Sequence, residues 1–366
     1  MPNILLVPKG FLGDVLLTTP VIEALKASEP EARITCLVPP GLSDFVGRDP
    51  LVDDVIVFDR GGEHSGWQGL RQLAGLLRER QFGRAYAFHH SLRTALLLRM
   101  AAIPQRIGYA GGLASFFFSR RVAKPEKMHE VVRNLELVRA DLCPAVAEEV
   151  ERAARSGPAQ VSAFARLRVP PEDALRISDR VRQIIEEQKP FVVLAPGSAW
   201  ATKRWSAAGY HELAQLLMRQ GMRVVLTGAA SDADVCVEVA QGLSVANLCG
   251  STSLEDLMAL VRWASCVVCN DSSTLHIASA LQVPTVVVFC ATSPKFGFGP
   301  WKNRAAVVEK HDLFCKPCRR HGSRRCPTGT NACMTGVSAD EVFRAVQSLA
   351  GGRDGGASSG RLHVVE

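Results

Sequence analysis

An α/β fold made of two doubly wound, Rossmann-like domains is predicted by three features of the sequence. The chain has 366 residues, which is about twice the usual size of one domain. Short apolar runs alternate with amphipathic stretches in the first half, and a second series of the same kind follows a connecting region. Strands that alternate with helices form parallel βαβ units, whose helices cover both faces of the sheet.

The first half opens with an apolar strand at Asn3–Val7, which leads through a glycine-containing turn into a helix from Asp14 to about Ala27. Apolar residues recur in this helix at steps of three or four, which is helical spacing. Pro20 interrupts the pattern, so we expect a kink or a delayed start of the regular helix. Further strands are expected at Arg33–Val38, Asp54–Phe58 and Arg84–Phe88, with a helix at about Leu70–Arg80.

The second half repeats the pattern after residues 145–190, which are rich in Ala, Glu and Arg and are expected to be helical or connecting. The repeated series comprises strands at Phe191–Ala195, Arg223–Thr227, Cys266–Asn270 and Thr285–Phe289, and helices at Ser206–Gln220, Asp232–Gln241, Ser253–Ala264 and Thr274–Leu281. We therefore predict domains at residues 1–175 and 176–350. They are expected to face a central cleft, because such folds bind ligands at the carboxyl ends of their strands. The Gly- and Ser-rich residues 351–366 are expected to form a flexible tail.

Composition and charge narrow the possible partners and the compartment. The net charge of +7 suits an acidic partner such as a phosphorylated glycolipid, a nucleotide or a membrane surface, although a slightly basic soluble protein is the plainer alternative. No apolar run approaches the length of about 18 residues that crosses a bilayer. The opening apolar run has the wrong order for a signal peptide. The 11 cysteines, odd in number and mostly scattered, suit reduced thiols in the cytoplasm.

The first candidate site is the segment Lys9-Gly10-Phe11-Leu12-Gly13-Asp14, which follows the opening strand. Gly13 allows a tight turn, and Asp14 is expected where the helix begins. Taken alone, Asp14 fits the common role of a helix N-cap. A helix N-terminus also keeps a carboxylate ionised, which makes it a weaker base.

Two further polar segments follow strands of the second half. Ala195-Pro196-Gly197-Ser198 precedes Lys203, and together they could hold a diphosphate, although the spacing is not that of a P-loop and an ordinary loop with a solvated lysine fits equally. The segment Asn270-Asp271-Ser272-Ser273-Thr274-Leu275-His276 runs from a strand end into a helix start. Its backbone N–H groups, hydroxyls and helix dipole favour phosphate oxygens. Alternatively, it is a serine-rich cap above a core histidine.

A cysteine-rich segment near the C-terminus is the fourth candidate. Cys315, Cys318, Cys326 and Cys333 lie within 19 residues and begin with a CxxC pair. Such residues bind zinc when they come together as Cys₄. The second pair does not repeat the CxxC spacing, so a reduced or partly disulfide-linked loop is the preferred interpretation. Its basic residues, without an acidic one between Cys315 and Cys326, could meet an anionic acceptor or be solvated.

At these segments the sequence resembles glycosyltransferase family nine, the heptosyltransferases. The matching residues are Gly13-Asp14-Val15-Leu16-Leu17-Thr18-Thr19-Pro20, then Pro196-Gly197-Ser198 with Lys203-Arg204-Trp205, then Asn270-Asp271-Ser272 through His276. They occur in the family's order and spacing over almost the whole chain, and the cysteine-rich segment is similar to one found in many members. The resemblance implies a GT-B fold and an inverting, metal-independent transfer of heptose from ADP-heptose to the inner core of lipopolysaccharide, without a cofactor.

The resemblance also assigns residues. Asp14 would be the catalytic base, and Ser198 and Lys203 would contact the donor phosphates. The donor pocket would further contain Asp271, Ser272, Ser273, His276, an acidic ribose contact at Asp232 and Thr252 near the adenine. The family usually has glycine where this chain has Ser273, whose side chain would either crowd the phosphate or supply a hydroxyl contact. Candidates for binding an anionic acceptor are Arg93, Arg120, Arg121 and His129, which a solvated basic face explains equally well.

The partners implied are a nucleotide sugar and the anionic lipopolysaccharide core, with peripheral contact to the inner membrane from the cytoplasm and no nucleic acid. The cysteine pattern favours addition of the second heptose. Three alternatives remain. A family relative could use another nucleotide sugar or acceptor, a GT-B sugar-nucleotide epimerase would need an acid/base pair that is not evident, and a non-catalytic sensor would not need Asp14. A nicotinamide dehydrogenase would normally show GxGxxG after the first strand, where only Gly10 and Gly13 occur.

Overall fold

The computed structural model describes residues 2–155, 165–350 and 364–365, and these divide into two compact units. The first unit contains residues 2–155 and 165–171, and the second contains residues 172–350 with 364–365. The division therefore falls between Pro171 and Glu172, against a predicted boundary between residues 175 and 176. The predicted tail lies outside the described residues, except for residues 364–365.

The first unit is built on a six-stranded parallel sheet in the order β3-β2-β1-β4-β5-β6. Its strands are β1 (Asn3–Val7), β2 (Arg33–Val38), β3 (Asp54–Val57), β4 (Arg84–Ala87), β5 (Gln105–Tyr109) and β6 (Arg120–Val122). Four of the five residues of β1 are buried, because β1 pairs with β2 and β4 on its two edges and helices cover both faces. The sequence pattern did not predict β5 and β6.

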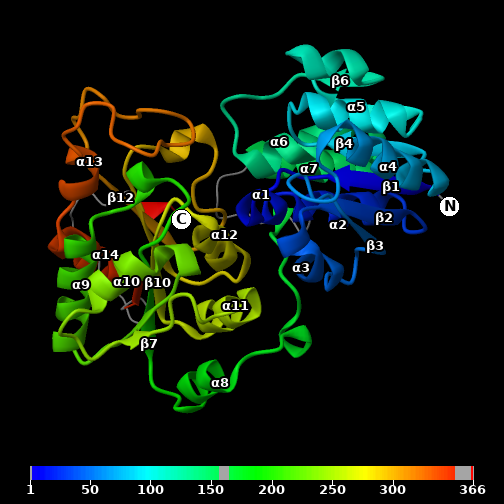
Figure 1. Ribbon diagram of the computed structural model, residues 1–366. Helices are drawn as coiled ribbons and strands as arrows, with labels where there is room; N and C mark the ends of the chain where they lie inside the picture. The colour runs from blue at the N-terminus through cyan, green and yellow to red at the C-terminus, as the bar shows by residue number, and fades with distance from the viewer. Residues whose placement is uncertain (1, 156–164, 351–363, 366) are drawn as a thin grey trace. The chain divides into compact units, whose positions relative to one another are not determined.

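Helices cover this sheet on both sides. They are α1 (Leu12–Leu16), α2 (Thr19–Ser28), α3 (Ser43–Gly47), α4 (Gly66–Glu79), α5 (Leu92–Met100), α6 (Glu130–Val138) and α7 (Pro144–Arg155). Short 3₁₀ segments occur at η1 (Pro40–Leu42), η2 (Leu113–Phe117) and η3 (Arg139–Asp141). The apolar sides of α4 and α5 pack with η2 on one face of the sheet, whereas α2 packs with α6 and α7 (Figure 1).

The predicted helix from Asp14 to Ala27 is in fact two helices. The first, α1, already begins at Leu12, so Gly13 and Asp14 lie inside its first turn rather than in a preceding loop. The second, α2, begins at Thr19 and carries Pro20 in its first turn. Proline is tolerated there because the first-turn N–H groups have no partner within the helix. Pro20 therefore lies at the start of a new helix, where its missing N–H is tolerated.

The second unit is built on a seven-stranded sheet in the order β13-β12-β11-β10-β7-β8-β9. Its strands are β7 (Phe191–Ala195), β8 (Arg223–Leu226), β9 (Ala246–Asn247), β10 (Cys266–Asn270), β11 (Thr285–Phe289), β12 (Ala305–Glu309) and β13 (Val364–Val365). All pairs are parallel except that of β12 with β13. The central strands β7, β10 and β11 are buried at every position, which explains why they were predicted from apolar runs.

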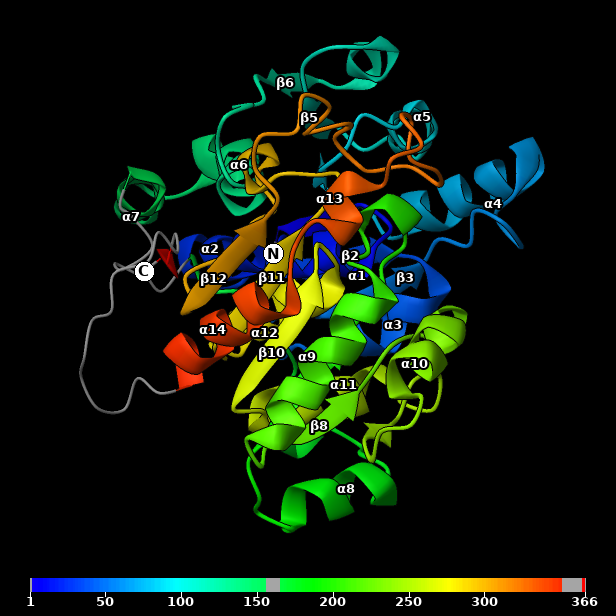
Figure 2. The same cartoon turned by 90° about the vertical axis from the view of Figure 1, so that its left-hand side faces the viewer.

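The helices of this unit are α8 (Asp179–Glu186), α9 (Ala207–Arg219), α10 (Ala233–Ala240), α11 (Leu254–Trp263), α12 (Ser273–Ala280), α13 (Ala332–Thr335) and α14 (Ala339–Ala350), with 3₁₀ segments η5 (Glu172–Ala174), η6 (Ala201–Lys203), η7 (Ala230–Asp232) and η8 (Pro294–Phe296). Figure 2 shows α9, α10 and α14 in front of the sheet, where they share one apolar core with β7, β8, β10 and β11. Helix α11 packs against α8 and α12. Each unit is therefore a doubly wound α/β sheet, as predicted.

Candidate active site

Asp14 lies in the first turn of α1, just beyond the carboxyl end of β1. The N-cap of α1 is Phe11, without a side-chain cap, so Asp14 does not have the N-cap role considered from the sequence. Its side chain is 16% exposed and lies 3.2 Å from the Nζ atom of Lys9. The structure thus gives Asp14 a partly solvated carboxylate with a cation beside it.

Lys9 connects Asp14 to a second, buried carboxylate. Its Nζ atom also donates to Oε1 of Glu130 at 2.5 Å, and Glu130 is the first residue of α6. Burial lowers the pKa of Lys9, but the charges of Asp14 and Glu130 outweigh this effect and raise it above its usual value. Lys9 is therefore a firmly held ammonium group shared by two carboxylates.

Glu130 stays ionised although its side chain is only 1% exposed. Lys124 Nζ lies 3.2 Å from Oε1, and Arg133 Nη1 lies 2.8 Å from Oε2. Burial alone would raise the pKa of Glu130, but Lys9, Lys124 and Arg133 lower it to about 2. Sequence reasoning missed this network, because Lys9 and Glu130 are 121 residues apart and no local pattern links them.

The predicted donor residues Ser198, Lys203 and Asp271 are brought together in the second unit. They follow strands β7 and β10, which are neighbours in the sheet. Lys203 Nζ forms an ion pair of 2.7 Å with Oδ2 of Asp271, and Ser198 Oγ donates to the Asp271 carbonyl at 3.2 Å. Thr292, which follows β11, also donates to Asp271 Oδ2 at 2.7 Å. Thr292 was not predicted, although its place after a central strand is the signal that could have found it.

Asn270 fixes this arrangement from inside the core. Its buried Nδ2 donates to the Pro196 carbonyl at 2.8 Å, and its Oδ1 accepts from the Trp205 backbone N–H at 2.9 Å. Trp205 is buried, packs on Tyr210 with ring centroids 4.8 Å apart and donates to the Val337 carbonyl. Trp205 therefore serves in packing.

Asp232 lies against the Gly197 turn. A Cβ atom on Gly197 would lie only 2.2 Å from Oδ2 of Asp232, so this close approach requires glycine. Arg204 joins the two segments, because it donates to the Ser198 carbonyl and lies 3.1 Å from Oδ1 of Asp232. The structure thus places the predicted ribose contact next to the predicted phosphate contacts. Arg204 was quoted in the matching segment without a role.

The start of α12 carries two buried polar atoms without a partner. Among the described residues, neither Ser272 Oγ nor His276 Nδ1 has a hydrogen-bond partner. Burial lowers the pKa of His276 to about 4, so its ring is neutral at physiological pH. Ser273 is the first residue of α12 and is half-buried. Orphaned polar atoms beside free N–H groups at a helix start are the feature expected of a site that a polar ligand completes.

Thr252, predicted near an adenine, is half-buried in the loop before α11. The loop approaches the strand-end turn that leads to Asp232, because Gly250 N–H donates to the Gly228 carbonyl at 3.0 Å. Hydrogen bonds thus bring the segment of Thr252, although not its side chain, towards the other donor residues.

The four predicted acceptor residues have varied partners in the first unit. Arg93 donates to the carbonyls of His64 and Gly66, and His129 is the N-cap of α6. Arg120 forms a two-point ion pair with Asp141. Arg121 donates to the Ser115 carbonyl at 2.9 Å and is exposed. Arg120 and His129 therefore also have partners within the fold, and their role in acceptor binding stays a prediction.

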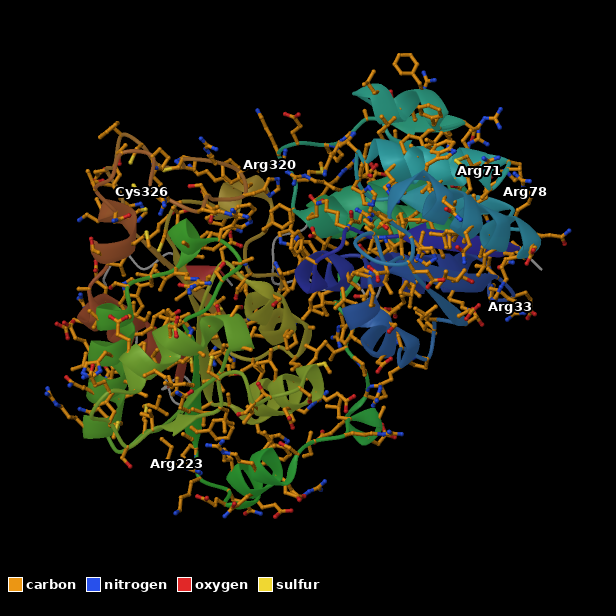
Figure 3. All side chains as sticks on the ribbon, viewed as in Figure 1. Arg33, Arg71, Arg78, Arg223, Arg320 and Cys326 are labelled. Carbon is orange, nitrogen blue, oxygen red and sulfur yellow. The ribbon has the colours of Figure 1, made fainter. Side chains whose placement is uncertain are left out.

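The cysteine-rich segment packs beside the turn that carries Lys203. Thr202 exchanges hydrogen bonds with the backbone of Ser323, and Figure 3 shows Arg320 and Cys326 in this segment. Lys316 binds Glu309 at 2.7 Å and is not solvated. All four cysteines are free thiols. In the described part of the chain, no three His, Cys, Asp or Glu side chains are arranged to hold a metal ion, and the Cys₄ alternative stays a prediction.

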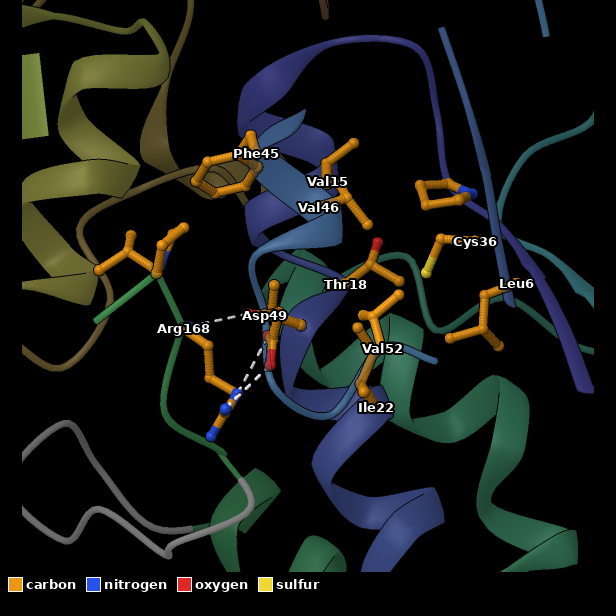
Figure 4. A pocket seen from close by; sticks show the side chains of 14 residues that line it. Leu6, Val15, Thr18, Ile22, Cys36, Phe45, Val46, Asp49, Val52 and Arg168 are labelled. Carbon is orange, nitrogen blue, oxygen red and sulfur yellow. Dashed lines mark hydrogen bonds and ion pairs between the residues drawn. The ribbon is translucent and has the colours of Figure 1, made fainter. Parts of the chain in front are cut away.

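A small apolar pocket lies beside α1 and α2 in the first unit (Figure 4). Its polar rim is the ion pair of Arg168 with Asp49, 2.9 Å long. The lining includes Val15 but none of the predicted site residues. This pocket is therefore separate from the Asp14 carboxylate.

Comparison with known proteins agrees with this geometry. The model of glycosyltransferase family 9 (heptosyltransferase) matches residues 70–327. Lipopolysaccharide heptosyltransferase 2 of Salmonella typhimurium is 28% identical over 323 residues, covering 84% of this chain and 87% of the relative, and that of Escherichia coli is 27% identical over 314 residues with the same coverage. The structure of E. coli ADP-heptose lps heptosyltransferase II has a TM-score of 0.70 at 25% identity, covering 95% of this chain and 98% of that one. A family 9 glycosyltransferase from Veillonella parvula has a TM-score of 0.77 at 21% identity, covering 95% and 97%.

Two doubly wound units and this set of strand-end residues define a glycosyltransferase of the GT-B fold. The chain belongs to glycosyltransferase family 9, the heptosyltransferases. The resemblance recognised from the sequence is therefore confirmed. Within the described residues no helix is both long enough and apolar enough to cross a membrane.

Proposed function

We propose that this protein transfers heptose from ADP-heptose to the inner core of lipopolysaccharide, with inversion at the anomeric carbon and without a metal ion. Its relatives named lipopolysaccharide heptosyltransferase 2 support the sugar and the acceptor. The observation that carries the proposal is the donor cluster, in which Lys203 and Asp271 adjoin the unpartnered Ser272 and His276.

The donor cluster suits a diphosphate leaving group. As the bond from the anomeric carbon to the phosphate oxygen breaks, ADP leaves with the electron pair and gains negative charge. Lys203 and the N–H groups at the start of α12 supply positive potential for that charge in place of a metal. A diphosphate would compete with Asp271 for the Lys203 ammonium group. Asp232 would accept from the ribose hydroxyls, with Thr252 at the base and Ser198 and Ser273 at the phosphates.

Asp14 is proposed as the general base. It would take the proton of the acceptor hydroxyl while the oxygen attacks the anomeric carbon from the face opposite to ADP. Lys9, 3.2 Å away, holds the carboxylate in place. A base paired with a cation is weaker, and Glu130 offsets this effect because it takes part of the charge of Lys9.

The acceptor proposed is an anionic glycolipid that already carries one heptose, and the protein is proposed to work in the cytoplasm in peripheral contact with the inner membrane. Arg93, in α5, and Arg121, in β6, are proposed contacts for its phosphate or carboxylate groups; Arg121 is exposed and Arg93 is half-buried. Arg120 and His129 are proposed as further contacts, and each also holds its own segment. No nucleic acid partner is proposed.

The test is transfer by the purified protein from ADP-heptose to delipidated core acceptors with no heptose or one heptose, with and without EDTA. Asp14→Asn should lower kcat about 10²–10⁴-fold, and Lys203→Ala about 10²–10³-fold. Asp44→Asn, in the first turn of the similarly short α3, and Lys189→Ala, at an exposed lysine, are the matched controls. Near-normal transfer by Asp14→Asn would refute the base, and loss of transfer with EDTA would refute metal independence.

The nucleotide is tested separately by thermal shift with ADP, UDP, GDP and NAD. Selective stabilisation by ADP is expected. Stabilisation by UDP or GDP would replace the donor and keep the mechanism. A response to NAD alone would refute the proposed function.

A further inference from the structure

The segment η2 holds two large apolar side chains out in solvent. Leu113 is 70% exposed and Phe116 is 73% exposed, whereas Phe118 just beyond them is buried in the core of the first unit. Phe118 is so tightly seated that a Cβ atom on Gly108 would lie 2.2 Å from its ring. Phe118 therefore fixes the segment to the core, and the backbone so fixed carries the two exposed side chains.

Hydrogen bonds from two arginines hold the backbone of η2 in place. Arg121 Nε donates to the Ser115 carbonyl at 2.9 Å, and Arg106 Nε donates to the Phe117 carbonyl at 2.9 Å. The Arg121 guanidinium also lies 5.9 Å from the centre of the Phe116 ring. Arg121 thus lies beside the exposed Phe116 ring, and Arg106 binds the backbone of the same segment.

The surrounding sequence is free of acidic residues. Between Glu79 and Glu126, the 46 residues 80–125 contain no Asp or Glu. They contain eight basic residues, which are Arg80, Arg84, Arg93, Arg99, Arg106, Arg120, Arg121 and Lys124. In the part of the chain that the structure describes, Arg99, Arg106 and Arg121 form no ion pair with a carboxylate. Burial lowers the pKa of Arg106, and the positive charge of nearby Arg99 lowers it further. Helix α5, which carries Arg99, packs directly against η2, and β6 is the edge strand beside it (Figure 1).

We propose that the η2 tip, defined as Leu113 and Phe116 with Arg99, Arg106 and Arg121 around them, docks on an anionic phospholipid bilayer. Exposed apolar side chains enter the interface between head groups and acyl chains, and basic side chains bind the anionic head groups. The two contributions are of different kinds and reinforce one another, which is typical of reversible membrane contact. The proposal deepens the proposed function, because it names the surface that brings the enzyme to a membrane-bound acceptor.

Other occupants fit the surface less well. A second copy of this chain would set one positive rim against another, which like-charge repulsion opposes. A nucleic acid would use the arginines and the Phe116 ring, but it offers nothing to Leu113. A bilayer uses all five side chains.

The experiment is co-sedimentation of the full chain with vesicles of phosphatidylcholine alone or with one quarter phosphatidylglycerol, at low and high salt. Wild-type protein should bind the anionic vesicles, and high salt should weaken binding. Leu113→Ser/Phe116→Ser should weaken it about tenfold or more. The matched control is Val237→Ser/Phe314→Ser, which removes side chains of the second unit that are 63% and 94% exposed and should bind as wild type. Arg99→Gln should weaken binding in low salt.

Absence of wild-type binding to anionic vesicles, or equal losses in the two double variants, would overturn the proposal. Binding that appears only when the vesicles carry lipopolysaccharide would also overturn it, because the tip would then serve the acceptor. Preferential binding of RNA over vesicles would overturn it as well. Transfer to a delipidated acceptor should be unchanged in Leu113→Ser/Phe116→Ser. Failure of wild-type transfer would refute the proposed function, whereas the vesicle result stands or falls without it.

Discussion

Replacing Lys9 by methionine should move the acid limb of the transfer reaction to higher pH. Lys9 is the cation beside the proposed base, 3.2 Å from Asp14, and methionine keeps most of its apolar stem without the charge. Loss of an opposite charge at this range disfavours the ionised carboxylate. The proton then leaves Asp14 only at higher pH, so kcat/KM falls off earlier as the pH is lowered.

The size of the change follows from the geometry. Two unit charges 3.2 Å apart at an effective dielectric of about 20 interact by about 5 kcal/mol, and partial solvent exposure reduces this value. Carboxyl groups beside a cation at such range typically have a pKa about 1–3 units lower, so the acid limb should rise by about that amount in Lys9→Met. His89 is also near Lys9, and burial, with nearby Arg60 and Lys9, lowers its pKa to about 4, so the same profiles are recorded in a His89→Asn background to separate its titration from that of Asp14.

Two further variants test the direction of the shift in the acid limb. Glu130→Gln leaves the charge of Lys9 to Asp14 alone, so its acid limb should move to lower pH, opposite to Lys9→Met. Lys124→Met removes another cation 3.2 Å from Glu130 and should raise the acid limb less than Lys9→Met does. The assay is kcat/KM for a delipidated acceptor from about pH 2 to pH 8, because an aspartate ordinarily titrates near pH 3.9. The coupling of Asp14 to Glu130 through Lys9 would be refuted if wild type and Lys9→Met had the same acid limb. It would also be refuted if the acid limb moved equally in Lys9→Met and Lys124→Met.

Three further predictions concern the donor cluster and the buried network. Gly197→Ala should weaken ADP binding about tenfold by calorimetry, because the new Cβ would lie 2.2 Å from Asp232 Oδ2; Gly10→Ala, with no atom within 4 Å, is the control, and equal affinities would contradict the contact. Asn270→Ala should cost about 1–3 kcal/mol in urea unfolding, since it leaves buried backbone groups without partners, and an unchanged midpoint would count against this role. Glu130 has its pKa lowered from 4.5 to about 2, so its stabilisation of about 3 kcal/mol is present above pH 4.5 and is lost as the pH falls towards 2. The difference in unfolding free energy between wild type and Glu130→Gln should therefore shrink between pH 5 and 3; a constant difference would exclude this linkage.

The sequence predicted those parts of the fold in which local pattern and burial agree. Strands β7, β10 and β11 are apolar at nearly every position because both faces of the sheet are covered, and their bounds were predicted from that pattern. Strands β5 and β6 were missed for the opposite reason. They carry Arg106, Arg120 and Arg121, whose side chains bind carbonyls or Asp141, so their sequence does not show an apolar run.

The candidate donor site was predictable because its residues lie at strand ends. Parallel strands end on the same edge of a sheet, so Ser198 and Asp271, which follow neighbouring strands, had to lie close together. What could not be predicted was their state. Lys203 is engaged by Asp271 rather than free, and Asp232 reaches the Gly197 turn only because that residue has no side chain.

The network behind Asp14 shows where local patterns stop being informative. A buried glutamate costs several kcal/mol unless cations surround it, and Glu130 meets that condition with Lys9, Lys124 and Arg133, which come from three separate places in the chain. Arg133 is one helical turn from Glu130 in α6, a local pattern, whereas Lys9 is 121 residues away and has no pattern with Glu130 in the sequence. Lys9 also lies 3.2 Å from Asp14 and so acts on both carboxylates directly. This direct contact is the reason that Lys9→Met is expected to affect the base more than the similar substitution Lys124→Met.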